Sequence, residues 1–350
     1  MDLSKYKSKG YTGLANLGNT CFLNSCIQVL NHTYEFHQIL DSEKVKKYIK
    51  GKIPDAKILT EWNDLRQVMW SGNGVVTPNR FVNNVQEIAE VKDKDIFTGF
   101  AQNDMPEFLL FIMDCIHNSI SRGVKMRISG NVENDVDSMA VKCYDMLKNI
   151  YEKEYSEIMD MFYGIYISEI RSKDGTISHV MKPESYFILD LPIVKTTTVV
   201  DTVEECFELF THPEYLEGDN AWYNEKTGQK EDIRKSITFW SLPKVLVIVL
   251  KRFTPDGQRK ITNLVKFPLE NLDLSRYVRG YSASSHVYDL YGVCNHMGGV
   301  MGGHYTAFVK NAENKWMHYN DTTVEILQNP NDVISPMAYC LFYRKKNNLL

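Results

Sequence analysis

The chain has 350 residues, 43% hydrophobic and 24% charged, which is typical of a folded globular protein rather than a disordered one. Its 40 Lys and Arg nearly balance its 44 Asp and Glu, and this net charge of −4 argues against a nucleic-acid-binding protein, which needs a basic excess. No apolar run approaches the roughly 20 residues that cross a bilayer and residues 1–9 lack an apolar signal core, so we expect an intracellular protein of the cytoplasm or nucleus (of a host cell, if a virus encodes it) with no membrane contact.

The first predicted helix begins near Cys21. Apolar residues recur every three or four positions across Cys21–Leu30, which indicates one buried face of a helix. Asn19 and Thr20 precede this stretch and are expected to cap the helix.

A second helix is predicted to begin at Asp104, an N-cap residue, with Glu107 completing a capping box. Pro106 falls in its first turn, where a missing N–H costs little. The polar stretch Ser121–Ser138 is expected to be an exposed excursion, and Lys142–Met161 is expected to be helical again.

The second half of the chain is predicted to be mainly β, with turn residues between segments rich in Val, Ile, Leu, Tyr and Phe. The expected strands lie within Ser185–Ile193, Lys244–Phe253, His286–Val293, His304–Val309, Lys315–Tyr319 and Ala338–Tyr343. The run Val245–Leu250 is apolar on both faces, which is typical of a central strand. Helices followed by antiparallel strands indicate an α+β fold, and the absence of an evident linker favours one composite domain.

The cysteines do not form a disulfide framework or a zinc ribbon, because their number is odd and no Cys-x-x-Cys pair occurs. We expect most of them to be small buried residues and expect no metal or cofactor. Their positions are 21, 26, 115, 143, 206, 294 and 340.

Cys21 differs from the other cysteines in its context. The segment 13–20 contains two glycines and two asparagines, which indicates a specially shaped loop before a helix. A cysteine in the first helical turn is expected to have a lowered thiol pKa, as a nucleophile needs. The backbone N–H of Cys21 and the side chain of Asn16 are candidate donors to an oxyanion. The alternatives are a buried core cysteine and a turn-forming asparagine.

His304 is the candidate general base for such a nucleophile. It follows the glycine-rich segment Gly298–Gly303, which lets another chain approach closely, and it precedes a predicted strand. Asn320 and Asp321 follow at a hairpin-like interval, so a neighbouring strand can bring either side chain to the imidazole. The alternatives are a surface histidine at the end of a glycine-rich hairpin and an ordinary Asn-Asp turn.

Four blocks, in order, resemble the ubiquitin-specific proteases, the papain-like deubiquitinating enzymes. GLANLGNTCFLNSCIQVLNH is similar to their cysteine box, AQNDMPEF to their QQDAQEF-like helix start, and LPKVLVIVLKRF with KITNLVKFP to the strand and turn that follow. YDLYGVCNHMGGVMGGHYTAFVKNAENKWMHYNDTTVEI is similar to their histidine box. The resemblance implies a papain-like fold in a single catalytic domain over 10–346, with a helical thumb (about 10–160), β-rich fingers (about 161–250) and a palm with the histidine box (about 251–346).

The resemblance also implies an activity and its residues. The substrate would be ubiquitin on protein conjugates or chains, cleaved by a monomeric enzyme. Cys21 falls on the nucleophile, His304 on the base, Asn320 on the third triad position, and Asn16 on the oxyanion donor. Asp321 falls on an adjacent acidic position that shares or takes over the orienting role.

Further positions match residues that bind the ubiquitin tail. Asp104 matches an acidic residue that contacts its arginine, and His296 matches a position near the site that is the rival to His304 as base. The remaining matches are Gln102, Glu107, Phe253 and Tyr305.

The chain departs from the family pattern at the fingers. Many members carry two Cys-x-x-Cys pairs there that bind zinc, but here Asn224 and Thr227 stand at the second pair and Cys206 is isolated. We therefore expect fingers held by packing and strand pairing instead of metal. Pro106 within the helix-start motif and Asn instead of Asp at position 320 are further departures.

Three other hypotheses remain open beside a thiol isopeptidase. The first is a non-catalytic ubiquitin-binding scaffold, which a dead site with unchanged ubiquitin binding in Cys21→Ala would favour. The second is the same chemistry on a ubiquitin-like modifier, since a Gly-Gly tail does not separate the two. The third is a transglutaminase- or acyltransferase-like Cys-His enzyme, which would leave the AQNDMPEF segment unexplained.

Overall fold

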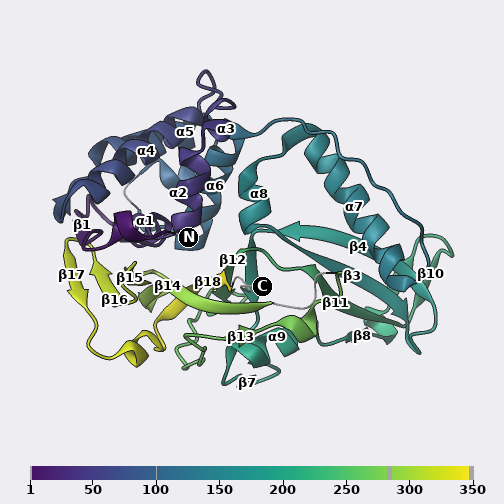
Figure 1. Cartoon of the computed structure of the whole chain (residues 1–350). Coiled ribbons are helices and arrows are strands. Elements are labelled where there is room, and N and C mark those ends of the chain that lie inside the picture. Colours follow the sequence, from purple (N-terminus) through teal and green to yellow (C-terminus); the bar gives the residue numbers. More distant parts are fainter. Residues whose placement is uncertain (1, 100, 282–285, 347–350) are drawn as a thin grey trace.

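The computed structural model describes residues 2–99, 101–281 and 286–346. Helices dominate the N-terminal part at the upper left of Figure 1, and strands dominate the remainder. No helix in these ranges is long and apolar enough to span a membrane. The helices are α1 (Cys21–Asn31), α2 (Tyr34–Asp41), α3 (Glu43–Lys46), α4 (Ala56–Ser71), α5 (Asn79–Val91), α6 (Met105–Ile120), α7 (Asp135–Glu154), α8 (Glu157–Phe162) and α9 (Val203–Thr211).

The strands form one large sheet, a second sheet of four strands and several two-stranded ribbons. In chain order they are β1 (Thr12–Leu14), β2 (Gly74–Val76), β3 (Gly164–Ser172), β4 (Ser178–Tyr186), β5 (Ile188–Leu191), β6 (Val194–Lys195), β7 (Thr198–Val199), β8 (Glu214–Leu216), β9 (Trp222–Asn224), β10 (Gln229–Glu231), β11 (Ile233–Ser241), β12 (Val245–Leu250), β13 (Leu272–Asp273), β14 (Val287–Gly299), β15 (Gly302–Lys310), β16 (Trp316–Asn320), β17 (Thr323–Ile326) and β18 (Ala338–Lys345).

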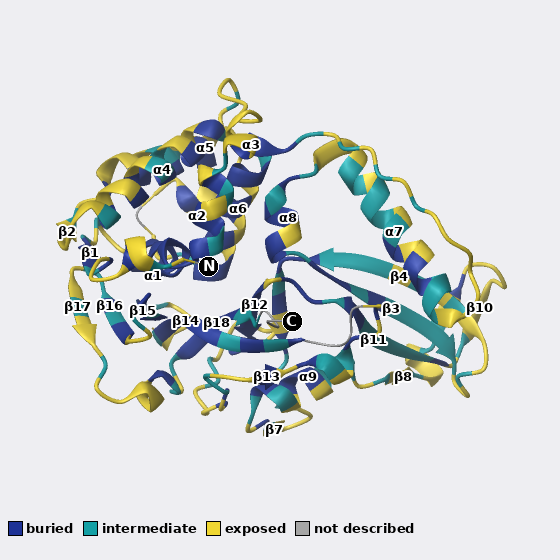
Figure 2. Cartoon of the chain, viewed as in Figure 1, coloured by how far each residue is buried: buried dark blue, intermediate teal, exposed yellow. Residues whose placement is uncertain are grey.

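The large sheet packs against helix α1. Its strand order is β17-β16-β15-β14-β18-β12-β5, and β13 pairs with β14. Every residue of β12 is buried, and this strand lies between β18 and β5, which confirms the predicted central strand. Helix α1 is buried along its length, as Figure 2 shows in dark blue. It contacts β14, β15 and β16. The predicted cysteine helix and histidine strand are therefore packed together in one core.

The four-stranded sheet has the order β4-β3-β11-β8 and lies at the right of Figure 1. Helix α7 covers one face of it, where Met139 and Cys143 pack near Ile165, Ile167 and Trp240. Helix α9 also packs against this sheet, since its Phe210 contacts Tyr166 of β3 and Phe239 of β11. Tyr166 lies between Ile165 and Ile167 on β3, so apolar side chains are covered on both faces of the sheet.

Two predicted boundaries in this region are wrong. The exposed excursion ends at Asn134 rather than Ser138, because the Asn134 Oδ1 accepts a hydrogen bond from the Asp137 N–H (3.0 Å) and caps α7 there. The helix expected over Lys142–Met161 is two helices, since Tyr155 leaves helical geometry and exchanges backbone hydrogen bonds with Arg122.

Candidate active site

Cys21 is the first residue of α1, and its side chain is only 2% exposed. The loop before it is shaped by Asn16, whose Oδ1 accepts hydrogen bonds from the N–H groups of Gly18 (3.2 Å) and Thr20 (3.0 Å). The expected capping of α1 by Thr20 does not occur, because its hydroxyl accepts a hydrogen bond from the Leu17 N–H (2.9 Å) instead. The loop therefore folds back on itself and presents Cys21 at the start of the helix.

Burial raises the pKa of the Cys21 thiol above its ordinary value. A hydrogen bond with the backbone of Tyr305 acts in the opposite direction, and the nearby charge of Asp321 raises the pKa further. The lowered pKa expected from the helix start is thus wrong for the free protein, because desolvation outweighs the helix N-terminus. The contact with Tyr305 also places the thiol against the residue that follows His304.

This arrangement predicts the pH dependence of alkylation of the free protein. Because only the thiolate reacts, alkylation of Cys21 by iodoacetamide should be slow at pH 7 and should accelerate by about tenfold per pH unit toward the raised pKa. Mass spectrometry of the peptide that contains Cys21, sampled over time at several pH values, measures this rate. A rate already at its maximum at pH 6 would contradict the predicted thiol state.

His304 lies on β15 beside strand β16, which carries Asn320. The His304 Nε2 lies 2.7 Å from the Asn320 Oδ1, so the imidazole Nε2–H donates a hydrogen bond to the amide oxygen. That tautomer leaves Nδ1 free to accept a proton. Of the two candidate orienting residues, Asn320 is the one that the structure brings to His304.

Asp321 contacts the loop that precedes Cys21 instead. Its Oδ2 accepts a hydrogen bond from the Asn16 Nδ2 (2.9 Å), and its Oδ1 accepts one from the Asn24 Nδ2 (2.7 Å). Its backbone oxygen accepts a third from the Leu14 N–H (2.8 Å). These hydrogen bonds do not support the predicted role of Asp321 as orienter of the imidazole. Instead, Asp321 holds the Asn16 side chain in place.

The strand before the Cys21 loop and the turn that carries Asp321 lie so close together that position 13 must be a glycine. A Cβ on Gly13 would lie 2.4 Å from the backbone oxygen of Thr322, so any larger residue would push β1 away from the turn that carries Asp321.

Asn24 is a residue that the sequence reasoning missed. Its position one helical turn after Cys21 is the signal that points to it.

Four of the predicted tail-binding residues lie where α6 meets β15, namely Gln102, Asp104, Glu107 and Tyr305. The Gln102 side chain makes two hydrogen bonds with the backbone of Gly303, each 2.5 Å long. The Asp104 Oδ1 accepts a hydrogen bond from the Tyr305 hydroxyl (3.1 Å) rather than capping α6, so the expected capping box is wrong. Helix α6 nevertheless begins at Met105, with proline tolerated in its first turn.

Charge at this junction is partly buried. Burial raises the pKa of Asp104, and hydrogen bonds from Tyr339 and Tyr305 act against this rise. Glu107 lies nearby on α6 and is exposed. Glu107 therefore presents its carboxylate to solvent beside the partly buried Asp104.

His296 is buried, with 4% of its surface exposed, and packs against aromatic rings. Its ring centroid lies 4.7 Å from that of Tyr305 and 5.7 Å from that of Phe253. Burial and then the charge of Lys260 lower its pKa to about 4, so the ring is neutral at pH 7. Its Nδ1 has no hydrogen-bond partner among the described residues. These features suit a wall of the site better than a general base.

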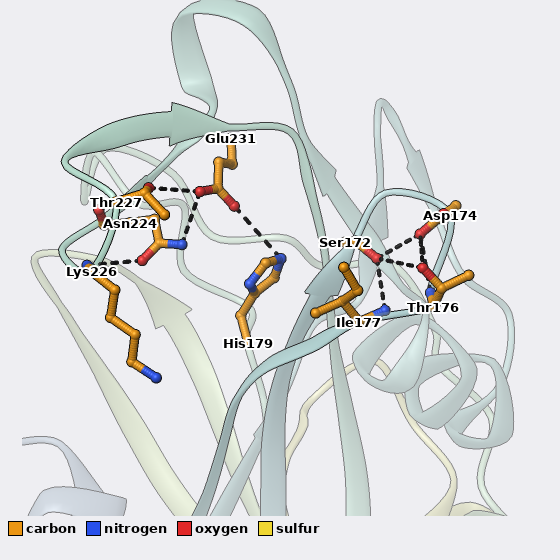
Figure 3. A network of polar contacts seen from close by, with 9 residues as sticks. All are labelled: Ser172, Asp174, Thr176, Ile177, His179, Asn224, Lys226, Thr227 and Glu231. Atoms are coloured by element: carbon orange, nitrogen blue, oxygen red, sulfur yellow. Dashed lines mark hydrogen bonds and ion pairs between the residues drawn. The ribbon is translucent and has the colours of Figure 1, made fainter.

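The remaining cysteines are all free and buried within the described ranges. Burial raises the pKa of each of their thiols, which makes them unreactive: Cys26, Cys115, Cys143, Cys206, Cys294 and Cys340. In the same ranges no group of three or more His, Cys, Asp and Glu side chains is arranged to hold a metal ion. Asn224 and Thr227 instead donate hydrogen bonds to Glu231, as Figure 3 shows.

A family model described as ubiquitin carboxyl-terminal hydrolase matches residues 12–343. Ubiquitin carboxyl-terminal hydrolase Usp2 of Drosophila melanogaster is 34% identical over 344 residues, which cover 97% of this chain and 35% of that protein. Human ubiquitin carboxyl-terminal hydrolase 2 is 34% identical over 350 residues, which cover 97% of this chain and 56% of that protein. The chain thus spans between a third and just over half of the length of these relatives.

Solved structures share the fold. The SAGA DUB module of Ubp8, Sgf11, Sus1 and Sgf73 bound to monoubiquitin matches with a TM-score of 0.71 and 25% identity, covering 97% of this chain and 70% of that chain. The same module bound to ubiquitin aldehyde matches with a TM-score of 0.70 and 24% identity, covering 98% and 71%. This likeness confirms the predicted papain-like α+β fold.

Proposed function

The chain belongs to the ubiquitin carboxyl-terminal hydrolase family, and we propose that it is a thiol-dependent deubiquitinase that cleaves the peptide or isopeptide bond after the C-terminal glycine of ubiquitin. The observation that carries this proposal is the placement of Cys21 at the start of α1, against the backbone next to His304, whose imidazole contacts Asn320. The similarity to a module solved with monoubiquitin supports ubiquitin as the substrate.

In this proposal each side chain has one task. Cys21 is the nucleophile, His304 is the general base and acid, and Asn320 orients the imidazole by accepting a hydrogen bond from its Nε2–H. Asn16 and the Cys21 backbone N–H donate to the oxyanion, since the Asn16 amide keeps a second hydrogen after binding Asp321.

The proposed reaction proceeds in two halves. His304 takes the thiol proton, and the thiolate attacks the carbonyl carbon of the terminal glycine to form a tetrahedral oxyanion. The oxyanion collapses, the bond to the leaving amine breaks, and His304 gives that amine its proton. Water, deprotonated by His304, then hydrolyses the thioester, and Cys21 leaves as the thiol. These steps use only side-chain and backbone groups of the chain, the substrate and water.

We assign the junction of α6 and β15 to the ubiquitin tail and call this proposed path the tail channel. Asp104 and Glu107 would pair with arginine in the tail, while Gln102 holds Gly303 at the edge of the channel. Phe253, Tyr305 and His296 form an aromatic wall beside it. A tail that ends in two glycines suits a narrow passage that excludes bulkier side chains.

The proposal includes the setting in which the enzyme works. Ubiquitin conjugates are its partners, and it acts as a monomer in the cytoplasm or nucleus without nucleic acid. The seven free cysteines among the described residues support a reducing compartment.

A ubiquitin that carries a thiol-trapping electrophile at its C-terminus tests this function. The wild-type protein is expected to gain the mass of one ubiquitin, and fragmentation should locate the bond at Cys21. Parallel reactions with ubiquitin-like modifiers that carry the same electrophile establish which modifier is preferred. A folded protein that forms no adduct with ubiquitin, or one at another cysteine, would overturn the proposal.

The variant Asp321→Ala is expected to lower kcat by about a hundredfold, because Asn16 loses the partner that aims its amide. KM should change little, since Asp321 contacts the loop before Cys21 rather than the tail channel. The measurement is steady-state hydrolysis of a ubiquitin–fluorophore amide. Glu325→Ala, which removes an exposed carboxylate four residues later, is the matched control. Equal kcat values for the two variants would rule out the positioning role.

A further inference from the structure

A short hairpin, residues 252–261, follows β12. Its two arms are joined by backbone hydrogen bonds, since the Ile261 N–H donates to the Arg252 oxygen (2.7 Å) and the Thr254 N–H donates to the Arg259 oxygen (3.0 Å). Neither arm is a strand of a sheet in the described part of the chain. A two-stranded hairpin is only marginally stable alone, so contacts with the rest of the fold must fix its position.

Arg252 fixes the base of the hairpin. Its side chain is fully buried, and its Nε donates a hydrogen bond to the backbone oxygen of Ala338 (2.6 Å), the first residue of β18. Its Nη1 donates to the backbone oxygens of Ile261 (3.0 Å) and Asn263 (2.9 Å). Burial lowers its pKa to about 10, so the guanidinium is still charged at neutral pH. Backbone oxygens therefore stabilise this buried charge and hold the hairpin against β18.

Lys260 attaches the second arm of the hairpin to β14. Its Nζ donates a hydrogen bond to the backbone oxygen of His296 (2.5 Å), and its side chain is half-buried. The His296 N–H points toward β18, since it donates to the oxygen of Met337 (2.8 Å), and the backbone oxygen of a strand residue points to the same side. Strand pairing on that side ends one residue earlier, because β18 begins at Ala338, whose partner is Asn295. The ammonium group thus supplies a donor to an oxygen that the sheet leaves without a strand partner.

The two residues that face each other across the hairpin both contact His296. Phe253 and Lys260 form a backbone bridge, and the ring centroid of Phe253 lies 5.7 Å from that of His296. The His296 ring centroid lies 4.7 Å from that of Tyr305, whose backbone forms a hydrogen bond with the Cys21 thiol. Contacts between neighbouring residues thus connect the hairpin with the backbone beside the nucleophile.

We propose that Lys260 is a positioning residue that holds the 252–261 hairpin against β14 and so sets the positions of Phe253 and His296 at the tail channel. The inference rests on the proposed function, because it concerns how one wall of the channel of the same enzyme is held. Arg252 holds the base of the hairpin, whereas Lys260 holds only its second arm. Removing the Lys260 ammonium group should therefore loosen this wall without unfolding the domain.

The strength of this contact depends on the charge of Lys260. Burial and then the charge of Arg252 lower the pKa of Lys260 to about 8. The other titratable group beside it is His296, whose pKa of about 4 leaves the ring neutral at pH 7 and above. Lys260 is thus mainly charged at pH 7 and mainly neutral at pH 9. Because a neutral amine is a weaker hydrogen-bond donor than an ammonium group, the contact should weaken between these pH values.

Steady-state hydrolysis of a ubiquitin–fluorophore amide at pH 7 tests the positioning role. Lys260→Met keeps an unbranched side chain but removes the donor, and it should raise KM by roughly fivefold while kcat stays within about threefold. Lys260→Arg keeps a charged donor and should recover most of the loss. Arg259→Met is the matched control, because Arg259 is an exposed cation of the same hairpin, and it should change neither constant.

The pH dependence of binding is a readout that a purely structural residue would not change. Ubiquitin binding to Cys21→Ala, which separates binding from chemistry, should weaken by about threefold from pH 7 to pH 9 as Lys260 loses its proton. Cys21→Ala/Lys260→Arg should show little change over this range, and Cys21→Ala/Lys260→Met should bind weakly at both pH values. Titration calorimetry measures these affinities.

Hydrogen exchange reports on the hairpin directly. The amides of residues 252–261 should exchange faster in Lys260→Met than in the wild type at pH 7, and Lys260→Arg should restore most of the protection.

The outcomes distinguish the inference from the function on which it rests. An unchanged KM in Lys260→Met, an equal change in Arg259→Met, or the same pH dependence of binding in Cys21→Ala and Cys21→Ala/Lys260→Met would overturn the positioning role. Unchanged exchange of residues 252–261 would show that Lys260 does not hold the hairpin. A folded wild-type protein that does not hydrolyse the ubiquitin amide would overturn the proposed function, and hydrogen exchange would still decide whether Lys260 holds the hairpin.

Discussion

Replacing Cys21 with alanine is expected to abolish hydrolysis of a ubiquitin–fluorophore amide, with kcat reduced by about ten-thousandfold or more. The substitution removes the nucleophile, and no other thiol can replace it because the remaining cysteines of the described ranges are buried with raised pKa values. Ubiquitin binding should stay within about twofold, since the Cys21 side chain is only 2% exposed and offers little contact area. Steady-state kinetics and titration calorimetry measure the two quantities.

Cys26→Ala is the matched control for this substitution. Cys26 lies on the same helix and is fully buried, so its removal tests the loss of a thiol without the loss of a nucleophile. This variant should keep kcat within about threefold while losing some stability from the small cavity. Turnover retained in Cys21→Ala, or lost equally in Cys26→Ala, would show that the nucleophile is assigned wrongly.

His304→Ala is expected to lower kcat by about a thousandfold or more, because the thiol of Cys21 has a raised pKa and needs a base at neutral pH. The loss should shrink as the pH rises toward the thiol pKa, since hydroxide then forms the thiolate without the imidazole. KM should change by much less than kcat. Measuring kcat from pH 6 to pH 10 for the wild type and the variant checks both statements.

Substitution of His296, the other histidine of the site, is expected to have a different effect from substitution of His304. Its pKa of about 4 leaves the ring neutral at pH 7, and its contacts are with the rings of Tyr305 and Phe253. His296→Gln should therefore act mainly on KM, through the wall of the tail channel. A loss of kcat in His296→Gln as large as that in His304→Ala would reverse the assignment of the base.

The capping predictions show where local sequence reasoning failed. Thr20 and Asp104 are residue types that cap helices, and both stand directly before a helix. Neither side chain caps, because each has a competing partner: the Leu17 N–H for Thr20, and the hydroxyl of Tyr305, 201 residues away, for Asp104. A preference of about 1 kcal/mol for a cap is easily exceeded by such a contact in a partly buried site.

The pKa of Cys21 is a second case of the same kind. A helix start favours the thiolate, and this was readable from the sequence. Burial favours the thiol, and burial depends on the strands that cover α1. We infer that the free protein holds a protonated nucleophile and that its deprotonation falls to His304.

The sequence by itself determined the helical first half, the central strand β12, the position of Cys21 at a helix start and the order of the blocks that assign the family. These properties are local, because periodicity and turn residues act within about a dozen neighbouring residues. Only the tertiary structure decided that Asn320 contacts His304, that Asp321 holds Asn16 across 305 residues, and that Lys260 contacts the backbone of His296. Asn320 is the last residue of β16, whereas Asp321 lies in the turn after it at a φ of +48°, so the backbone path sends these two neighbours to different partners.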